Sequence, residues 1–202
     1  MKNTFIILAF VSASIVSHAQ TNNDIIPPQP IEQSKFSIGV KGAFGHSFLM
    51  PYSEPAFMPS WDAGISTIFS PYEHLGFGID ATYSGEGVKF VTPEYTSVTH
   101  LNYVRVPVKV IYFFRHYDKD FRPKVAIGPT IGFLTNKGEN AGYNKFDFGA
   151  NASLGFNYRL LRAVWLNADA SYYQGFTDVY KSNNEKDLNG NVRLNLGLSF
   201  GF

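Results

Sequence analysis

Few residues in this chain have the type and spacing that covalent chemistry needs. His46-Ser47 and His100 could supply a base and a hydroxyl group for acyl transfer. Asp80 or Asp169 could then orient such a histidine. Nothing in the spacing of these residues requires this chemistry, because histidines are common in loops for reasons of solubility alone. We therefore predict that the protein is not an enzyme.

Metal and cofactor binding are not indicated either. The sequence has no cysteine, and we expect His46 and His100 at one end of the fold and His74 and His116 at the other. A zinc ion needs three or four ligands that converge on one point, so we predict no metal site. The glycines around Gly85-Glu-Gly87 lack the strand-to-helix context of a phosphate cradle, so we predict no cofactor.

Charged residues recur instead in the polar phase of segments whose other phase is almost entirely apolar. The four acids and four bases at these positions are Lys41, Asp62, Asp80, Arg105, Lys109, Asp147, Asp169 and Arg193. Side chains that point into a narrow barrel must pair with one another or with trapped water. Three interpretations are open: an ion-pair network that fixes strand register, a narrow ion path, or concealed catalytic acids. We favour the network, because breaking a buried pair costs roughly 3–5 kcal/mol.

Strands must position these charges, and the chain contains eight segments in which apolar residues alternate strictly with polar ones. The segments run over 36–40, 65–69, 75–83, 104–112, 125–133, 146–156, 166–172 and 192–202. This period of two is typical of strands whose two faces meet different solvents. A face in bulk water would be rich in lysine and glutamate, yet all seven glutamates fall in the predicted tail, turns or loops. We predict an all-β fold, an eight-stranded antiparallel up-and-down transmembrane β-barrel.

The connections between these segments alternate in length. Residues 70–74, 115–122 and 160–163 form short or compact turns, whereas 46–60, 85–100, 135–145 and 175–190 are longer. Outer-membrane barrels keep short turns in the periplasm and long loops outside, so we expect both termini in the periplasm. Aromatic residues fall near both predicted ends and favour two interfacial girdles. They are Phe36, Phe114, Tyr158, Trp165 and Phe202 at the periplasmic end and Trp61, Tyr83, Tyr103 and Tyr172 at the external end.

The first long loop is unusually apolar for a segment expected in water. Its apolar residues are Phe48, Leu49, Met50, Tyr52, Phe57 and Met58. Exposed apolar patches tend to mark interaction sites, so this loop is the candidate external contact surface. Two alternatives remain open: the loop folds inward and caps the lumen, or it lies on the lipopolysaccharide surface.

The N-terminal residues have the pattern of an export signal. A basic Lys2, a short apolar stretch and Ser17-His18-Ala19 predict a signal peptide over residues 1–19 that is cleaved before Gln20. Residues 20–34 show no periodicity and predict a flexible periplasmic leader, and residues 35–202 form the barrel domain. Without cysteine the chain cannot be a lipoprotein attached through an N-terminal cysteine.

Two prolines interrupt the strand pattern. Pro107 and Pro129 lie within neighbouring predicted strands, where each removes one ladder hydrogen bond. We therefore expect a bulge or a local kink at each of them, close together in the barrel wall.

Three segments of the chain resemble the strands of a known family. Leu101-Asn-Tyr-Val-Arg-Val-Pro-Val-Lys-Val-Ile-Tyr112, then Ala126-Ile-Gly-Pro-Thr-Ile-Gly-Phe-Leu134 and Phe146-Asp-Phe-Gly149, look like the strand signatures of the PorT-like outer-membrane β-barrel proteins of Bacteroidota. The resemblance covers most of residues 35–202, and the terminal Phe202 resembles the signal read by the barrel-insertion machinery. It implies the fold and the outer membrane. One role known in the family, as an accessory of a secretion system, becomes an expectation for this chain.

Together these features predict an outer-membrane protein with a side-chain-filled lumen that acts structurally or binds a partner through its external loops. A narrow pore for small solutes and an accessory component of a secretion or gliding apparatus are the alternatives. The expected partners are outer-membrane lipid, lipopolysaccharide and the barrel-insertion machinery, with an envelope protein as a further candidate. A net charge of only +1 gives no electrostatic reason to expect nucleic acid.

Overall fold

The computed structural model describes residues 35–50, 56–91, 94–136, 142–181 and 186–201. The predicted signal peptide, the leader and Phe202 lie outside these residues, as does Tyr52 of the first loop. Among the described residues no helix has the length and apolar character needed to cross a bilayer.

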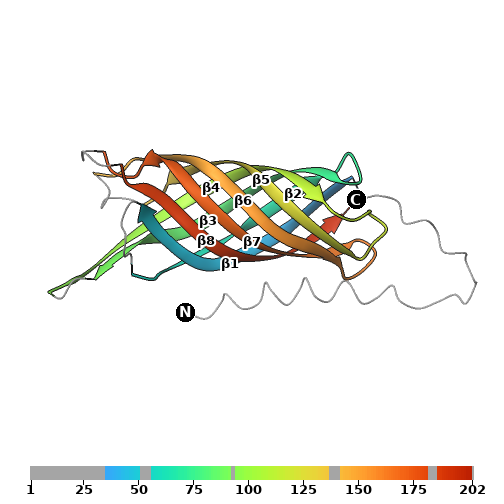
Figure 1. The fold of residues 1–202 in the computed structure, drawn as a ribbon, viewed down its shortest axis with the longest axis horizontal. Helices are drawn as coiled ribbons and strands as arrows, with labels where there is room; N and C mark the ends of the chain where they lie inside the picture. The colour runs from blue at the N-terminus through green and yellow to red at the C-terminus, as the bar shows by residue number, and fades with distance from the viewer. Residues whose placement is uncertain (1–34, 51–55, 92–93, 137–141, 182–185, 202) are drawn as a thin grey trace, which may run out of the picture. The chain divides into compact units, whose positions relative to one another are not determined.

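The described chain forms one closed antiparallel barrel in which each strand pairs with its neighbour in sequence (Figure 1). Its strands are β1 (Phe36–Met50), β2 (Met58–Phe69), β3 (Leu75–Val91), β4 (Thr96–Phe113), β5 (Phe121–Leu134), β6 (Phe146–Arg159), β7 (Val164–Asp178) and β8 (Leu188–Gly201). Pairing of β1 with β8, from Ser37 opposite Gly201 to Met50 opposite Leu188, closes the ring. The predicted eight-stranded antiparallel barrel is confirmed.

The alternation in the sequence becomes two surfaces. Side chains of the apolar phase face outward and stay exposed, among them Val40, Ile65, Ile127 and Leu194. Their neighbours in the polar phase face inward and are buried. An apolar outside around a polar inside is the arrangement that a lipid environment stabilises, because every backbone group of a closed barrel is paired within the sheet.

The strands are longer than the sequence pattern predicted. β1 continues to Met50, and β3 and β4 extend to Val91 and back from Thr96. The predicted loops at 46–60 and 85–100 were therefore too long at both ends. A strand needs about 9–11 residues to cross a bilayer, so strands of 17 and 18 residues reach well beyond it. Figure 1 shows the β3–β4 hairpin projecting past the barrel rim, at the end opposite the end of β8.

The two strand prolines interrupt the ladder without shifting it. Residues 108–109 of β4 and 128–129 of β5 are not paired with each other. Pro107 lies opposite Thr130 and Val110 lies opposite Ile127, so the register is the same on both sides of this unpaired stretch. The bulge that we predicted as one alternative is therefore wrong between β4 and β5, and the local kink stays a prediction. A register shift instead occurs between β7 and β8, between Gln174 and Asp178.

Most of the predicted girdle residues face outward, with two exceptions. Trp61, Tyr83 and Tyr172 are exposed toward the long-loop end, and Phe36, Phe114 and Tyr158 toward the short-turn end. Tyr103 and Trp165, in contrast, are 1% and 5% exposed and point into the barrel. Both belong to the inward phase of their strands, where Val104 and Leu166 next to them occupy the outward phase.

Candidate functional site: the charged lumen

The carboxylate of Glu86 is the centre of the ion-pair network in the upper lumen, the half toward the long loops. It is 1% exposed, and Arg105 donates from Nε and Nη2 to its two oxygens at 2.6 and 2.7 Å. Arg193 donates to the same carboxylate at 2.6 Å, and Ser84 donates at 2.7 Å. Asn189 of β8 donates a fifth hydrogen bond, at 2.8 Å. Five charge-assisted bonds on one buried carboxylate hold β3, β4 and β8 together at this level.

The two arginines extend this cluster around the barrel. Arg105 also donates to Asp147 of β6 at 2.9 Å, and Arg193 donates to Asp62 of β2 at 3.1 Å. The guanidinium carbon of Arg105 lies 4.5 Å from the ring centre of Tyr103 and 4.2 Å from that of Tyr173. A planar guanidinium between two aromatic rings is fixed by cation–π contacts as well as by its ion pairs.

A second cluster lies deeper in the lumen around Asp80. Lys109 and Lys41 contact the same carboxylate oxygen at 2.7 and 3.2 Å, and Ser66 donates to the other oxygen at 2.7 Å. Across the barrel, Lys124 of β5 pairs with Asp169 of β7 at 3.1 Å. With the upper cluster, five acids and five bases join in ion pairs, so the charges of these two clusters balance.

Two arginines form a third layer at the short-turn end. Arg122 donates to the carbonyl of Glu73 at 2.7 Å and covers the ring of Phe113 at 4.1 Å. Arg159 donates to the carbonyl of Tyr117 at 2.6 Å and covers Trp165 at 4.6 Å. Here carbonyl oxygens and aromatic faces, rather than a balanced set of carboxylates, stabilise buried cations.

Hydrophobic clusters lie at both ends of the charged interior. At the long-loop end Leu49, Val88, Leu101, Tyr103 and Val179 pack together. At the short-turn end Ile68, Ile111, Phe113 and Ala126 do the same. Two cavities within the charged interior measure about 50 and 40 Å³, and one at the short-turn end measures about 20 Å³. Each holds only a few water molecules at most. In the described barrel the lumen is therefore filled by its own side chains.

The structure places all eight charges selected from the sequence in the lumen and brings seven of them into direct pairs with other members of that set or with Glu86. The eighth, Asp169, pairs with Lys124, which the sequence analysis missed. Lys124 precedes outward-facing Val125, so its place in the alternation could have identified it. The prediction that Glu86 lies in a loop is wrong, because its flanking glycines resemble a turn but belong to β3. Gly87 has a φ of +154°, which lets the strand continue there.

The apolar residues of the first loop divide between two environments. Leu49 and Met58 are buried, as the inward-folding alternative predicted, and Leu49 belongs to the upper hydrophobic cluster. Phe57 is 59% exposed and stacks on His46 at a ring distance of 5.0 Å. Phe48 and Met50 are half-buried within β1. Only part of the predicted contact surface therefore faces outward.

The candidate acyl-transfer residues do not come together. His46 and Ser47 are adjacent in β1, so their side chains point to opposite faces of the wall. Ser47 Oγ bonds the backbone of Gly87 at 2.8 Å, and the Met58 N–H donates to His46 Nδ1 at 3.1 Å.

A Gly-x-Ser-x-Gly pattern that the sequence analysis overlooked occurs at Gly197-Leu-Ser-Phe-Gly201. It lies inside β8 rather than at a strand-to-helix turn, and Asn167 donates to Ser199 Oγ at 3.0 Å. The pattern therefore lacks the geometry of a nucleophile elbow.

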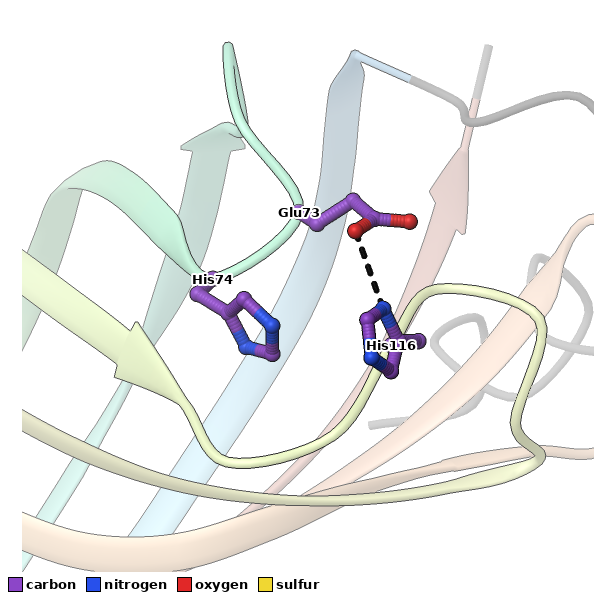
Figure 2. Close-up of side chains that lie close together, drawn as sticks. All are labelled: Glu73, His74 and His116. Carbon is purple, nitrogen blue, oxygen red and sulfur yellow. Dashed lines mark hydrogen bonds and ion pairs between the residues drawn. The ribbon is translucent and has the colours of Figure 1, made fainter.

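His74 and His116, for which we predicted no metal site, are neighbours in the structure. His74 of the β2–β3 turn and His116 of the β4–β5 turn have ring centres 4.9 Å apart, and Glu73 lies beside them (Figure 2). The prediction that no such site could be assembled is wrong in its geometry. Nearby, a hydrogen bond from Lys119 lowers the pKa of exposed Asp118, and the field of His116 acts in the same direction.

Comparisons with known proteins agree with this architecture. The structure is similar to that of Neisserial surface protein A, with a TM-score of 0.56, 18% identity, and coverage of 84% of this chain and 98% of the other. It is similar to OprG from Pseudomonas aeruginosa, with a TM-score of 0.55, 12% identity, and coverage of 83% and 95%. It also resembles the outer membrane enzyme PagL, with a TM-score of 0.50, 13% identity, and coverage of 79% and 97%. Identities this low establish the fold alone.

The search of curated proteins found no match. A family model described as "Outer membrane protein beta-barrel domain" matches residues 18–181, well over half of the sequence. The chain therefore belongs to the outer membrane protein beta-barrel domain family, and its location is the outer membrane.

Proposed function

We propose that this protein is a closed-lumen outer-membrane barrel that does not conduct, has no enzymatic activity, and acts by presenting its external end to an envelope or extracellular protein. The observation that carries this proposal is the filling of the lumen. Ion pairs occupy its middle, hydrophobic clusters cover both ends, and three cavities lined by lumen residues measure only about 50, 40 and 20 Å³.

Conductance tests the closed lumen directly. The refolded chain, checked by heat-modifiable migration on a gel, should give no reproducible single-channel current in a planar bilayer. A porin refolded and inserted in the same way serves as the positive control. Discrete, repeated currents from the folded barrel would reject the closed lumen and favour the small-solute pore, with Lys41, Asp80, Arg105 and Asp169 lining its path.

The protruding β3–β4 hairpin supports a role in binding. Pairing of β2 with β3 ends at Trp61 opposite Gly85, and pairing of β5 with β4 ends at Tyr103 opposite Leu134. The ladder between β3 and β4 continues beyond both points, to Val91 opposite Thr96. Within the described chain, Thr96–Thr99 thus has no further strand on its outer edge. Such an edge can accept an added strand from a partner.

The hairpin tip also exposes apolar side chains far from the membrane-spanning part. Val91 and Val98 are 58% and 44% exposed, and Phe57 of the first loop lies on the same side of the membrane. An exposed apolar surface next to an open strand edge fits an extended peptide segment of another protein better than a small polar solute. Lipopolysaccharide surrounding the barrel would then contact the hairpin base rather than its tip.

Site-specific photocrosslinking in cells tests this surface. A crosslinking residue at Val98 should form an adduct with one or a few defined proteins. The same residue at Tyr72, exposed on a short turn at the opposite end, should not form that adduct. Identical adducts at both positions, or none above background at Val98, would contradict binding through the hairpin. Copurification of a large complex with the Val98 adduct would favour a secretion or gliding apparatus.

The resemblance of β4 and β5 to PorT-like strands supports placing the protein in that group, as part of the same proposal. The segments that resemble this family include Arg105, Pro107 and Lys109 of β4. The shared pattern therefore includes residues that face the lumen as well as residues that face the lipid.

A further inference from the structure

Glu73, His74 and His116 converge between two turns at the short-turn end, on the opposite side of the membrane from the proposed binding surface. The side chains point toward one another across the gap between the β2–β3 and β4–β5 turns (Figure 2). One ligand atom from each lies within 4.8 Å of the others. Atoms bound to one zinc ion at about 2.0–2.2 Å lie some 3–4 Å apart, so small side-chain rotations would complete the arrangement.

The hydrogen bond of His74 prepares it as a ligand. Its Nδ1 lies 2.7 Å from the carbonyl oxygen of Phe113, and because a carbonyl only accepts, Nδ1 must carry the proton. The lone pair is then on Nε2. Metal-bound histidines commonly donate their other ring N–H to a backbone carbonyl in this way, which fixes the tautomer and the ring orientation. Stacking on Tyr112 at 5.9 Å restrains the same ring.

The second histidine is already in contact with the carboxylate. His116 Nδ1 lies 2.9 Å from Glu73 Oε2, a distance close to that between two neighbouring ligands of one ion. A metal ion would replace the proton that these two atoms now share. Glu73 and His116 are more than half exposed, so a hydrated ion can reach them from the aqueous phase and keep one or two waters.

We propose that Glu73, His74 and His116 form a divalent transition-metal site of the zinc type that links the β2–β3 turn to the β4–β5 turn. Two imidazole nitrogens and one carboxylate suit zinc, nickel, copper or cobalt rather than magnesium or calcium, which prefer oxygen ligands. The carboxylate compensates part of the added charge. The guanidinium of Arg122 bonds the backbone carbonyl of Glu73 and opposes a cation, so we expect a moderate affinity rather than that of a closed structural site.

The experiment uses the refolded chain in detergent without a histidine tag. Cobalt(II) is titrated while its visible absorption reports coordination, and zinc(II) is then added to displace it. We expect about one equivalent of cobalt to bind and zinc to displace it. His74→Asn keeps a donor for the Phe113 carbonyl but removes the ligand nitrogen, and His116→Ala removes the other imidazole. Each should weaken metal binding at least about tenfold, and Glu73→Gln should weaken it less.

His100→Ala is the matched control, because His100 is an exposed histidine at the opposite end of the barrel. It should bind cobalt and zinc as the unaltered chain does. Heat-modifiable migration confirms that every variant is folded before titration. Absence of binding to the folded parent chain at submillimolar metal would overturn the site, and so would equal loss in His100→Ala or unchanged binding in both His74→Asn and His116→Ala.

Discussion

The carboxylate of Glu86 accepts hydrogen bonds from both Nε and Nη2 of Arg105, at 2.6 and 2.7 Å, in a fully buried bidentate pair between β3 and β4. Arg193 donates to the same carboxylate. Glu86 is thus the shared counter-charge of two arginines on β4 and β8, which are not neighbouring strands in the barrel. Cross-lumen pairs of this kind restrain the barrel in a way that the ladder of backbone hydrogen bonds alone does not.

Replacing Glu86 by glutamine should destabilise the barrel by roughly 3–5 kcal/mol, because two buried guanidinium groups lose their shared counter-charge. The free energy of unfolding in urea, measured in phospholipid vesicles, checks this value. Glu94→Gln is the control, since Glu94 is exposed at the hairpin tip and should change stability by less than about 0.5 kcal/mol. Equal effects of the two substitutions would argue against the central role of Glu86.

Arg105→Ala should lower the unfolding temperature in detergent micelles, because Glu86 and Asp147 would lose a common partner and two aromatic rings would lose their guanidinium. Arg105→Lys should recover only part of the loss, since an ammonium group cannot make the bidentate pair or stack between Tyr103 and Tyr173. Unchanged unfolding temperatures for both variants would contradict a stabilising network.

The cluster around Asp80 offers a test of coupling. Asp80→Asn leaves Lys41 and Lys109 without their shared carboxylate and should destabilise the barrel by several kcal/mol. Adding Lys109→Met to this variant removes one uncompensated charge and should restore part of the stability. A double-mutant cycle built on urea unfolding measures the coupling, and strictly additive effects would show that the ion pair contributes nothing.

Backbone packing between β4 and β5 requires glycine at position 128. A Cβ atom there would lie 1.9 Å from the carbonyl oxygen of Val108, so the wall would have to move to admit it. Gly128→Ala should therefore cost about 1–3 kcal/mol. Gly42→Ala is the control, because its Cβ would meet nothing closer than 3.6 Å. Urea unfolding of both variants should separate them clearly, and equal stability would show that the wall relaxes without cost.

Substitutions that introduce a charged side chain can map the lipid-facing surface. Leu194 lies midway along β8 and is 71% exposed on the outer face, so Leu194→Arg should destabilise the barrel in vesicles by about 2–4 kcal/mol. Val98→Arg, on the protruding hairpin, should be nearly neutral because that side chain lies in water. If both substitutions had the same cost, the membrane boundary would lie elsewhere along the hairpin.

The order of residues along the chain was enough to determine the number of strands, their antiparallel arrangement and which phase meets lipid. This information is local, because each residue of a strand points to the face opposite its neighbours, and the two faces of a membrane barrel meet different solvents. Lys41, Asp80, Arg105 and Arg193 could be placed in the lumen from this alternation alone. Lys124 and Tyr103 obey the same rule and could have been placed in the same way.

Only the tertiary structure decided which side chains meet. Arg193 and Glu86 are 107 residues apart in the sequence and are in contact because the barrel closes. No local sequence pattern predicts this contact. Leu49 turned inward because an apolar cluster covers the mouth of the barrel, although its segment resembled an exposed loop. His74 and His116 came together because β3 and β4 pair side by side and bring their turns to the same edge. Periodicity specifies a face, whereas contact depends on register and closure, which are properties of the whole sheet.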